Sequence, residues 1–425
     1  MRLSSGFDEV DGVNVDTFLV IAICWLAGFL AVSKGIRSYA KVATFTACAS
    51  YVLMFMLFLA SVVQRGSLRG LNAYFRMEWG KLGELKTWRS ATQQLLYSSG
   101  LGIGLVVCYG SYKHFAWPVS PTIVKLIISD FLFSLLSGCV ALSLSGHATT
   151  LYGMDLEDIV VSGYEYAFVA YPESVKHFGH AELWCIAFYL LLCILAFSSV
   201  LSYLVTAMSA FEDMYPSLRE CRMLFSFATC AVLFCCSLPT VTGGGLYLLN
   251  LIDATIYLDL LPWIALAEVI LIVQGYGTAR LRQDIRFMTE QFPSAYFTIC
   301  WSYICPLALM IVSLGTVTSK RTELFHYTYP EWSGMLTLAI ILSCIFAVTT
   351  QILRILSENN NDIYAALEPE EDYGPADAET RMRYQDEMAA QNMLVPSNSS
   401  RSRKSMALTS TSANPSTALG ASGME

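Results

Sequence analysis

The sequence predicts an all-α membrane protein: a bundle of about nine transmembrane helices, one of which is broken. Hydrophobic residues make up 55% of the 425 residues and charged residues only 14%, a composition that a soluble domain of this length is not expected to have. Apolar runs recur at close to the roughly 20 residues that a bilayer crossing needs. The third run carries glycines at alternating positions, Gly100, Gly102 and Gly104.

Nine apolar runs are expected to cross the membrane, because charged or Gly/Pro-containing segments bound each of them. They cover residues 17–33, 42–63, 88–112, 121–146, 182–210, 223–249, 255–277, 297–318 and 333–356. Together they predict a transmembrane domain over residues 17–356, with a short segment, 1–16, before it and a tail, 357–425, after it.

The flanks of the first run predict the orientation of the chain. Four acids precede the run, whereas Lys34, Arg37 and Lys41 follow it. Because basic residues favour the cytoplasmic side, residues 1–16 are expected to be extracellular. The loop 65–89, with six basic residues against two acids, weakens this signal. The tail carries ten acids against two arginines over residues 357–391, which is typical of a disordered segment, here on the cytoplasmic side.

The alternating glycines indicate a helix that unwinds near residues 97–104. A spacing of two places no common face on a helix, so close helix packing is not the favoured explanation. Non-helical backbone at membrane depth needs polar partners, and its free carbonyl groups can hold an ion or a substrate. Ser98, Ser99 and Gln94 lie beside the glycines. A kink that only eases packing stays open as the alternative.

Two further polar groups interrupt apolar runs. Asp130 and Ser134 are four residues apart and share a helix face, and a carboxylate inside a membrane indicates function. Ser198, Ser199 and Ser202 form the second group, although serines in such helices often bond their own backbone. Hydroxyl, carbonyl and carboxylate oxygens suit Na⁺. The sequence contains no phosphate loop, nucleophile elbow or HExxH-type motif, so no enzyme and no enzymatic cofactor are expected.

The order of these pieces resembles the neurotransmitter:sodium symporter family over residues 15–356. The stretches that carry the resemblance are KGIRSYAKVATFTA (34–47), QQLLYSSGLGIG (93–104), GSYKHF (110–115), EYAFVAYPESV (165–175), FEDMYPSLRE (211–220), TGGGLYLLNLID (242–253), AEVILIVQGYG (267–277) and YPEW (329–332). The resemblance implies an inverted-repeat fold with broken helices at the bilayer midplane. It runs from the fourth to the twelfth of the family's spans, so three N-terminal spans are expected to be missing.

The resemblance also implies roles for single residues. The first sodium falls on Ser98 and Asp130, and the second on the Leu195 carbonyl with Ser198 and Ser199. Chloride falls on Gln94, Ser98 and Ser134. The residues implied for the substrate are Tyr97, Ser99, Gly100, Gly102 and Ser199. Glu268 matches an acid of an outer gate and Asp213 an acid of an inner gate.

Several residues depart from the family pattern. Asp130 stands where an asparagine is usual, and an ionised carboxylate there would attract Na⁺ but repel chloride, so we expect weaker chloride dependence. Ser198 replaces an aspartate usual in animal members, which should weaken the second sodium. Tyr203 replaces a small residue, which indicates a cramped pocket. The arginines that would pair with Glu268 and Asp213 belong to the part expected to be missing, so both acids are expected to lack partners.

The resemblance implies Na⁺-coupled symport of a neurotransmitter, an amino acid or a related small amine across the plasma membrane, with Na⁺ as the coupling ion and Cl⁻ as a second ion. As written, the chain is expected to be inactive because half of the site is missing. A non-transporting membrane partner or regulator of full-length relatives is the alternative. An unrelated receptor or channel is disfavoured. The protein is expected to lie in a lipid bilayer, and no nucleic acid is expected as a partner. Homo- or hetero-oligomerisation stays open.

Overall fold

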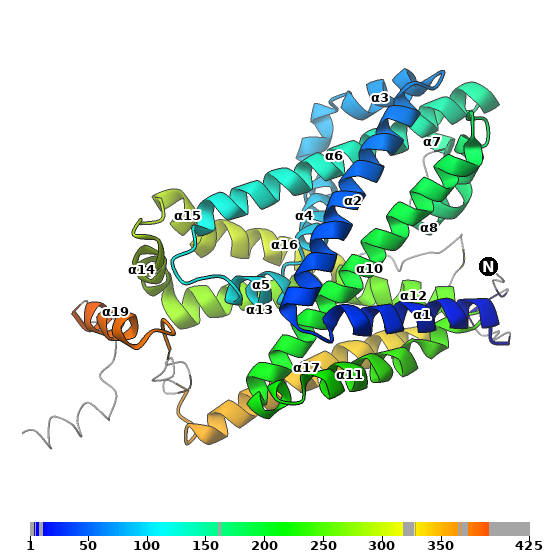
Figure 1. The fold of residues 1–425 in the computed structure, drawn as a ribbon. Coiled ribbons are helices and arrows are strands. Elements are labelled where there is room, and N and C mark those ends of the chain that lie inside the picture. Colours follow the sequence, from blue (N-terminus) through cyan, green and yellow to red (C-terminus); the bar gives the residue numbers. More distant parts are fainter. Residues whose placement is uncertain are drawn as a thin grey trace, which may run out of the picture. The chain divides into compact units, whose positions relative to one another are not determined.

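A computed structural model describes residues 4, 6–7, 12–159, 163–317, 327, 329–363, 366 and 373–390, and the regular elements in these ranges are helices (Figure 1). The chain forms two compact units. The first contains residues 1–114, 118–270 and 303–347, and the second contains residues 115–117, 271–302 and 348–425. Each unit is described by itself below.

Eight helices of the described part are long and apolar enough to cross a membrane, which confirms the predicted all-α class. They cover Val15–Val32 (α1), Ile36–Val62 (α2), Val119–Tyr152 (α6), Ala181–Met214 (α10), Arg222–Val241 (α11 and η4), Gly245–Thr289, Ala295–Gly315 and Ser333–Glu358 (α17). The third expected crossing, 88–112, is missing from this set because it is not one helix. It consists of α4 (Leu85–Ser99) and α5 (Leu105–Ser111) with a break between them.

The remaining helical elements are shorter. They are α3 (Ser67–Phe75), η1 (Trp79–Gly83), α7 (Leu156–Ile159), α8 (Gly163–Glu165), η2 (Tyr166–Ala170), α9 (Tyr171–Val175), η3 (Pro216–Arg219), α11 itself (Arg222–Ser237), η4 (Leu238–Val241), α12 (Gly245–Asp253), η5 (Ala254–Leu260), α13 (Leu261–Ile270), η6 (Leu271–Gly277), α14 (Thr278–Thr289), α15 (Ala295–Ile299), η7 (Cys300–Ile304), α16 (Cys305–Val317) and α19 (Ala378–Ala390).

The boundary between the sixth and seventh predicted crossings differs from the structure. The sixth was expected to run to residue 249, but the helical path stops at Val241 and starts again at Gly245. The chain folds back tightly here: a Cβ added to Gly245 would lie 2.1 Å from the Thr240 carbonyl oxygen. The glycines of TGGG therefore lie where one helix ends and the next begins. Hydropathy alone does not show this boundary, because the residues on both sides are apolar.

Three apolar clusters form the core of the first unit. One joins α2, α6, α9 and α10, a second joins α1, α2, α5, α10 and α11, and a third joins α4, α13 and α16. The two halves of the broken helix belong to different clusters, because Leu96 of α4 lies in the third and Cys108 of α5 in the second. The core thus holds each half separately and leaves the break between them.

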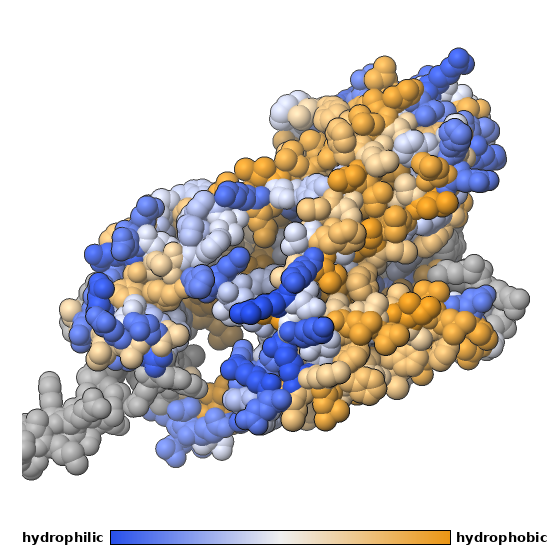
Figure 2. All heavy atoms as spheres, in the orientation of Figure 1, coloured by the Kyte–Doolittle hydropathy of each residue, from blue (hydrophilic) through white to orange (hydrophobic). Residues whose placement is uncertain are grey.

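Apolar side chains also cover the outer surface of the long helices. Leu19, Ile23 and Leu30 of α1 are between 53% and 65% exposed, and Figure 2 shows apolar residues spread over α1, α2 and α10 on the face in view. A soluble protein rarely exposes so large an apolar surface. Lipid is the medium that such a surface fits, in agreement with the multi-pass membrane arrangement.

The structure also differs from the sequence prediction after the last crossing. Residues 357–425 were expected to be disordered, yet Ala378–Ala390 forms helix α19, with Tyr384 and Met388 buried. The Ser/Thr-rich end of the tail, 391–425, lies outside the described residues, as does half of the expected extracellular segment 1–16.

Candidate functional site

The break in the third crossing is built from three glycines in the left-handed region of backbone space. Gly100, Gly102 and Gly104 have φ values of +62°, +75° and +79°. Residues with a Cβ avoid this region by roughly 1–2 kcal/mol each, so only glycine allows three such turns within five residues. The alternating spacing seen in the sequence is therefore the signature of the break itself.

The break exposes unpaired backbone oxygens. Within the described residues, no hydrogen bond reaches the carbonyl groups of residues 100–103, whereas the Gly104 carbonyl accepts the first bond of α5 from the Cys108 amide at 2.9 Å. Carbonyl oxygens without partners are costly in a membrane protein unless they face a polar ligand or water. The break can therefore offer oxygen ligands to a cation.

The break lies between α10 and α13. A Cβ on Gly102 would meet Leu261 Cδ1 at 2.9 Å and Ala265 Cβ at 3.4 Å, and one on Gly104 would meet Thr206 Cγ2 at 3.8 Å. Helix α13 therefore packs against backbone at Gly102 with no room for a side chain. This close approach fixes the position of the break within the first unit.

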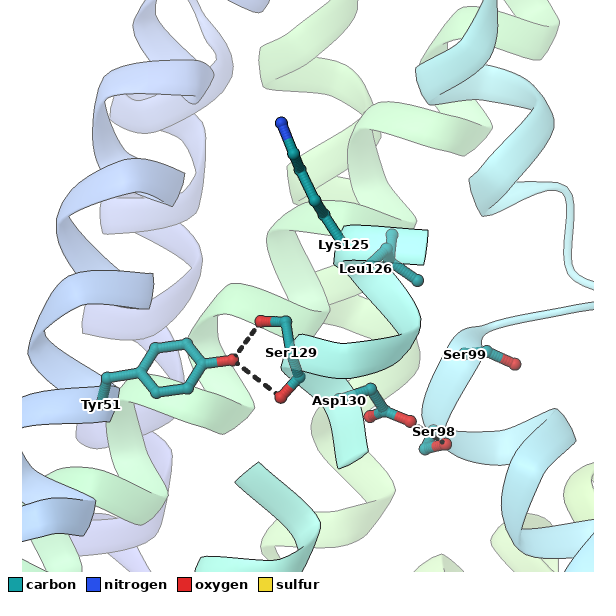
Figure 3. A pocket seen from close by; sticks show the side chains of 7 residues that line it. All are labelled: Tyr51, Ser98, Ser99, Lys125, Leu126, Ser129 and Asp130. Atoms are coloured by element: carbon teal, nitrogen blue, oxygen red, sulfur yellow. Dashed lines mark hydrogen bonds between the residues drawn. The ribbon is translucent and has the colours of Figure 1, made fainter. Parts of the chain in front are cut away.

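A carboxylate faces the end of α4 just before the break. Ser98 donates a hydrogen bond from Oγ to Asp130 Oδ2 of α6 at 3.1 Å, and Ser99 donates to the Leu95 carbonyl at 2.5 Å. The two serines and Asp130 line a pocket of about 530 Å³ together with Tyr51, Lys125, Leu126 and Ser129. In Figure 3, Asp130 points toward Ser98, whereas Lys125 points away from both.

The neighbour of Asp130 was missed by the sequence reasoning. The hydroxyl group of Tyr51, on α2, lies 2.5 Å from Ser129 Oγ and donates to the Ser129 carbonyl at 3.1 Å (Figure 3). This contact fixes α6 against α2 one residue before Asp130. Nothing in the spacing of Tyr51 pointed to it, because the two residues are 78 positions apart.

The residues expected to surround chloride are not joined in the structure. Gln94 and Ser134 are exposed, and neither forms a hydrogen bond to Ser98 among the described residues. The Ser98 hydroxyl is instead directed at Asp130. An anion beside Ser98 would therefore have to share that hydroxyl with a carboxylate, which ordinary electrostatics opposes.

The residues expected to hold the second sodium do lie together on α10. Ser198 and Ser199 both donate to the Leu195 carbonyl, at 2.9 Å and 3.1 Å. Leu195 lies in the interior of α10, so its carbonyl oxygen accepts these two protons in addition to its bond in the helix ladder. The three oxygens are close enough to act as one ligand set, but in this arrangement the serines bond their own helix, as the structural alternative predicted.

Tyrosines from three elements lie together near the end of α4. The Tyr97 ring contacts the Tyr257 ring edge to face at a centroid distance of 4.7 Å, and the Tyr257 hydroxyl lies 2.8 Å from that of Tyr203. Asp253 lies within electrostatic range of Tyr97, Tyr164 and Tyr257. The sequence reasoning singled out Tyr97 and Tyr203 but missed Tyr257 and Asp253. Asp253 is the last residue of the TGGGLYLLNLID stretch, and a charged residue in an apolar run was the signal that could have identified it.

The second half of the broken helix is tied to its neighbours by hydroxyl groups. Tyr109 of α5 lies 2.6 Å from the Tyr39 hydroxyl of α2, which lies 3.1 Å from Ser202 Oγ of α10. Ser202 also donates to the Ser198 carbonyl at 2.8 Å. A chain of contacts therefore runs from α5 to the Ser198 backbone of the expected second sodium set.

The two expected gate acids differ in their surroundings. Glu268 lies on α13, is exposed, and has no ion-pair partner among the described residues. Asp213 was expected to lack a partner too, and this prediction is wrong, because Arg219 Nη2 lies 2.6 Å from Asp213 Oδ1. The arginine comes from η3, six residues later. Both side chains of this pair are more than half exposed, so the pair contributes little to stability.

The comparisons with known proteins point to one family of transporters. The model of the sodium:neurotransmitter symporter family matches residues 1–358. The sodium- and chloride-dependent creatine transporter 1 of Mus musculus is 28% identical over 362 residues, which cover 84% of this chain and 57% of the relative. The sodium-dependent dopamine transporter of Bos taurus is 26% identical over 382 residues, which cover 88% of this chain and 55% of the relative.

A relative from an insect is also named as a sodium-dependent transporter. The sodium- and chloride-dependent GABA transporter ine of Drosophila melanogaster is 27% identical over 357 residues, which cover 81% of this chain and 38% of the relative. The chain therefore spans about half the length of the curated relatives it matches. All three relatives are named as transporters rather than enzymes.

Proposed function

We propose that this chain, which belongs to the sodium:neurotransmitter symporter family, binds Na⁺ and a small amino-acid-like or amine substrate in Na⁺-coupled symport. The relatives are named for creatine, GABA and dopamine transport, and all of these are small molecules with a cationic group. We place the protein in the plasma membrane, with the residues before α1 outside and the tail inside.

One observation carries this proposal: unpaired carbonyl oxygens and a carboxylate both lie next to the C-terminal end of α4. The break supplies the carbonyl groups of residues 100–103, and Asp130 is hydrogen-bonded to Ser98, two residues before the break. Na⁺ prefers hard oxygen ligands. We assign the first sodium to Ser98 and Asp130, completed by backbone oxygens of the break.

The substrate side follows from the same geometry. Tyr97 faces the Tyr257 ring, and Ser99, Gly100 and Gly102 continue from Tyr97 into the break. We propose that these residues contact the substrate. Because the hydrogen-bonded Tyr203 and Tyr257 side chains occupy space nearby, the substrate should be small. A bound Na⁺ would neutralise Asp130 and hold the break in one conformation, so substrate affinity would rise with the Na⁺ concentration.

The other proposed ion and gate residues lie on α10 and α13. The Leu195 carbonyl with Ser198 and Ser199 is our second sodium set, and its use requires the two hydroxyl protons to turn away from the carbonyl. Glu268 and Asp213 are proposed gate acids. For Asp213, gating would mean exchanging Arg219 for another cation, which its exposed position permits.

Binding of radioactive Na⁺ to the purified chain in lipid nanodiscs tests the first sodium directly. We expect Asp130→Asn and Ser98→Ala to weaken Na⁺ binding, with Asp130→Asn losing about tenfold in affinity, which corresponds to about 1.4 kcal/mol. Ser137→Ala is the matched control, because Ser137 lies on the same helix and only bonds the Ser134 carbonyl. Equal affinity in Asp130→Asn and the unmodified chain would remove the assignment.

A further inference from the structure

The tail helix α19 occupies a surface of the second unit that no transport role explains. This surface belongs to η6, at the end of the seventh predicted crossing, and to α14, which lies between the seventh and eighth predicted crossings. Gly277, with φ of +95°, separates the two elements, and Arg280, Arg282 and Arg286 make α14 a polar helix. In Figure 1, α19 lies beside α14.

A single carboxylate binds the tail to this segment. Asp284 of α14 accepts a hydrogen bond from the Tyr384 hydroxyl of α19 at 2.8 Å and another from Tyr276 of η6. The Tyr373 hydroxyl lies 3.2 Å from that of Tyr276, and because Tyr276 gives its one proton to Asp284, Tyr373 is the donor in this contact. Hydrogen bonds to a charged acceptor are roughly twice as strong as neutral ones, so Asp284 joins three separate parts of the unit.

Apolar packing accompanies these bonds. Tyr384 is 4% exposed and Met388, one turn later, is fully buried. The Phe287 ring of α14 meets the Tyr384 ring edge to face at 5.3 Å. Burial and the hydrogen bond to Asp284 both raise the pKa of Tyr384 above its ordinary value, so its hydroxyl remains protonated and available as a donor.

Helix α19 has a capped first turn, but it is too short to be stable without its contacts to the rest of the unit. Asp377 caps its first turn, accepting from the Thr380 amide at 2.9 Å and the Thr380 hydroxyl at 2.7 Å. Isolated helices of fewer than about 12–15 residues are marginal in water, and α19 has 13 residues. Its helical state therefore depends on the contacts with α14.

We propose that residues 373–390 form a releasable latch on α14, held by Asp284 and opened by negative charge at Tyr384. In the docked state the latch restrains the segment that connects two crossings. A negative group at position 384 would lie against the Asp284 carboxylate, and the two charges would repel each other. Arg280 already interacts electrostatically with Asp284, so its single positive charge does not compensate for a second acid.

Hydrogen exchange of the full chain in nanodiscs tests this latch without any transport assay. We expect Tyr384→Glu to speed the exchange of amides 378–390 at least tenfold and to speed that of α14 as well. Tyr384→Phe, which keeps the ring and loses one bond, should give a smaller increase. Exchange in α1 and α2 should stay unchanged in both variants, which shows that the rest of the fold is intact.

The matched control places the same charge on the other side of the helix. Met382 is 59% exposed on α19, so Met382→Glu should leave exchange at the level of the unmodified chain. Equal effects of Met382→Glu and Tyr384→Glu would overturn the proposal, because charge would then act on the helix and not on docking. Exchange of amides 378–390 at the rate of an unstructured peptide in the unmodified chain would overturn it as well. Both results are independent of whether the chain transports.

Discussion

Asp130 is the residue on which the sodium and chloride assignments depend. The sequence placed it on one helix face with Ser134, and the structure directs its carboxylate at Ser98 instead, at 3.1 Å. The two hydroxyls differ in what they can do. Ser98 lies next to the break and can share a cation with Asp130, whereas Ser134 is exposed on α6.

This position predicts a specific response to chloride. In the unmodified chain Asp130 supplies the negative charge beside the cation, so replacing chloride by gluconate should change Na⁺ binding little. In Asp130→Asn the fixed charge is gone and chloride should become necessary for tight Na⁺ binding. Na⁺ titrations of both forms with and without chloride measure this. Equal loss on chloride removal in the two forms would refute the idea.

Single residues also show what the sequence could predict. The family resemblance implied the grouping of Ser198 and Ser199 with the Leu195 carbonyl, and both serines bond that carbonyl in the structure. Asp213 was assigned no partner because only distant arginines were considered, whereas Arg219 reaches back through the short η3 turn. Tyr51 and Tyr257 were missed, since contacts between residues far apart in sequence depend on helix packing that no local pattern records.

At the scale of elements, the broken helix was predicted and other boundaries were not. Alternating glycines carry a local conformational signal, so the break at residues 100–104 could be read from the chain. Helix α3 could not be predicted from the chain, because its position depends on tertiary packing. It packs so closely against α6 that a Cβ on Gly70 would lie 1.7 Å from the Leu142 carbonyl oxygen. Helix α19 was missed because the acidic composition of the tail is typical of disordered segments. Only two of its described residues, Tyr384 and Met388, are buried, so it carries little apolar pattern.

The break itself gives a prediction on stability. Gly102→Ala places a Cβ at 2.9 Å from Leu261 Cδ1 in a backbone with φ of +75°, so we expect a loss of about 1–3 kcal/mol in stability and a lower melting temperature in detergent. Gly110→Ala is the control, because that glycine is in helix α5 with nothing within 4 Å of the added Cβ. It should be neutral or gain up to about 1 kcal/mol. Similar melting temperatures for the two variants would show that the break tolerates a side chain.

At the scale of the whole molecule, the two halves of the broken helix are held by different parts of the core. Two separate apolar clusters hold α4 and α5, so movement between the clusters would change the geometry of the break without disrupting either core. Symporters of the broken-helix type move groups of helices around a fixed midplane site in this way. The chain belongs to a family of such symporters, whose model matches residues 1–358, and this agrees with a break held between two clusters.

The central claim is that Na⁺ binds at Ser98 and Asp130 together with backbone oxygens of the break, and hydrogen exchange of residues 100–104 tests it most directly. The purified chain in nanodiscs would be compared in NaCl and in choline chloride at equal ionic strength. Our account predicts slower exchange of amides 100–104 in Na⁺, no change in α1, and loss of the Na⁺ effect in Asp130→Asn. Exchange that is the same in Na⁺ and choline, or that slows equally in Asp130→Asn, would contradict it.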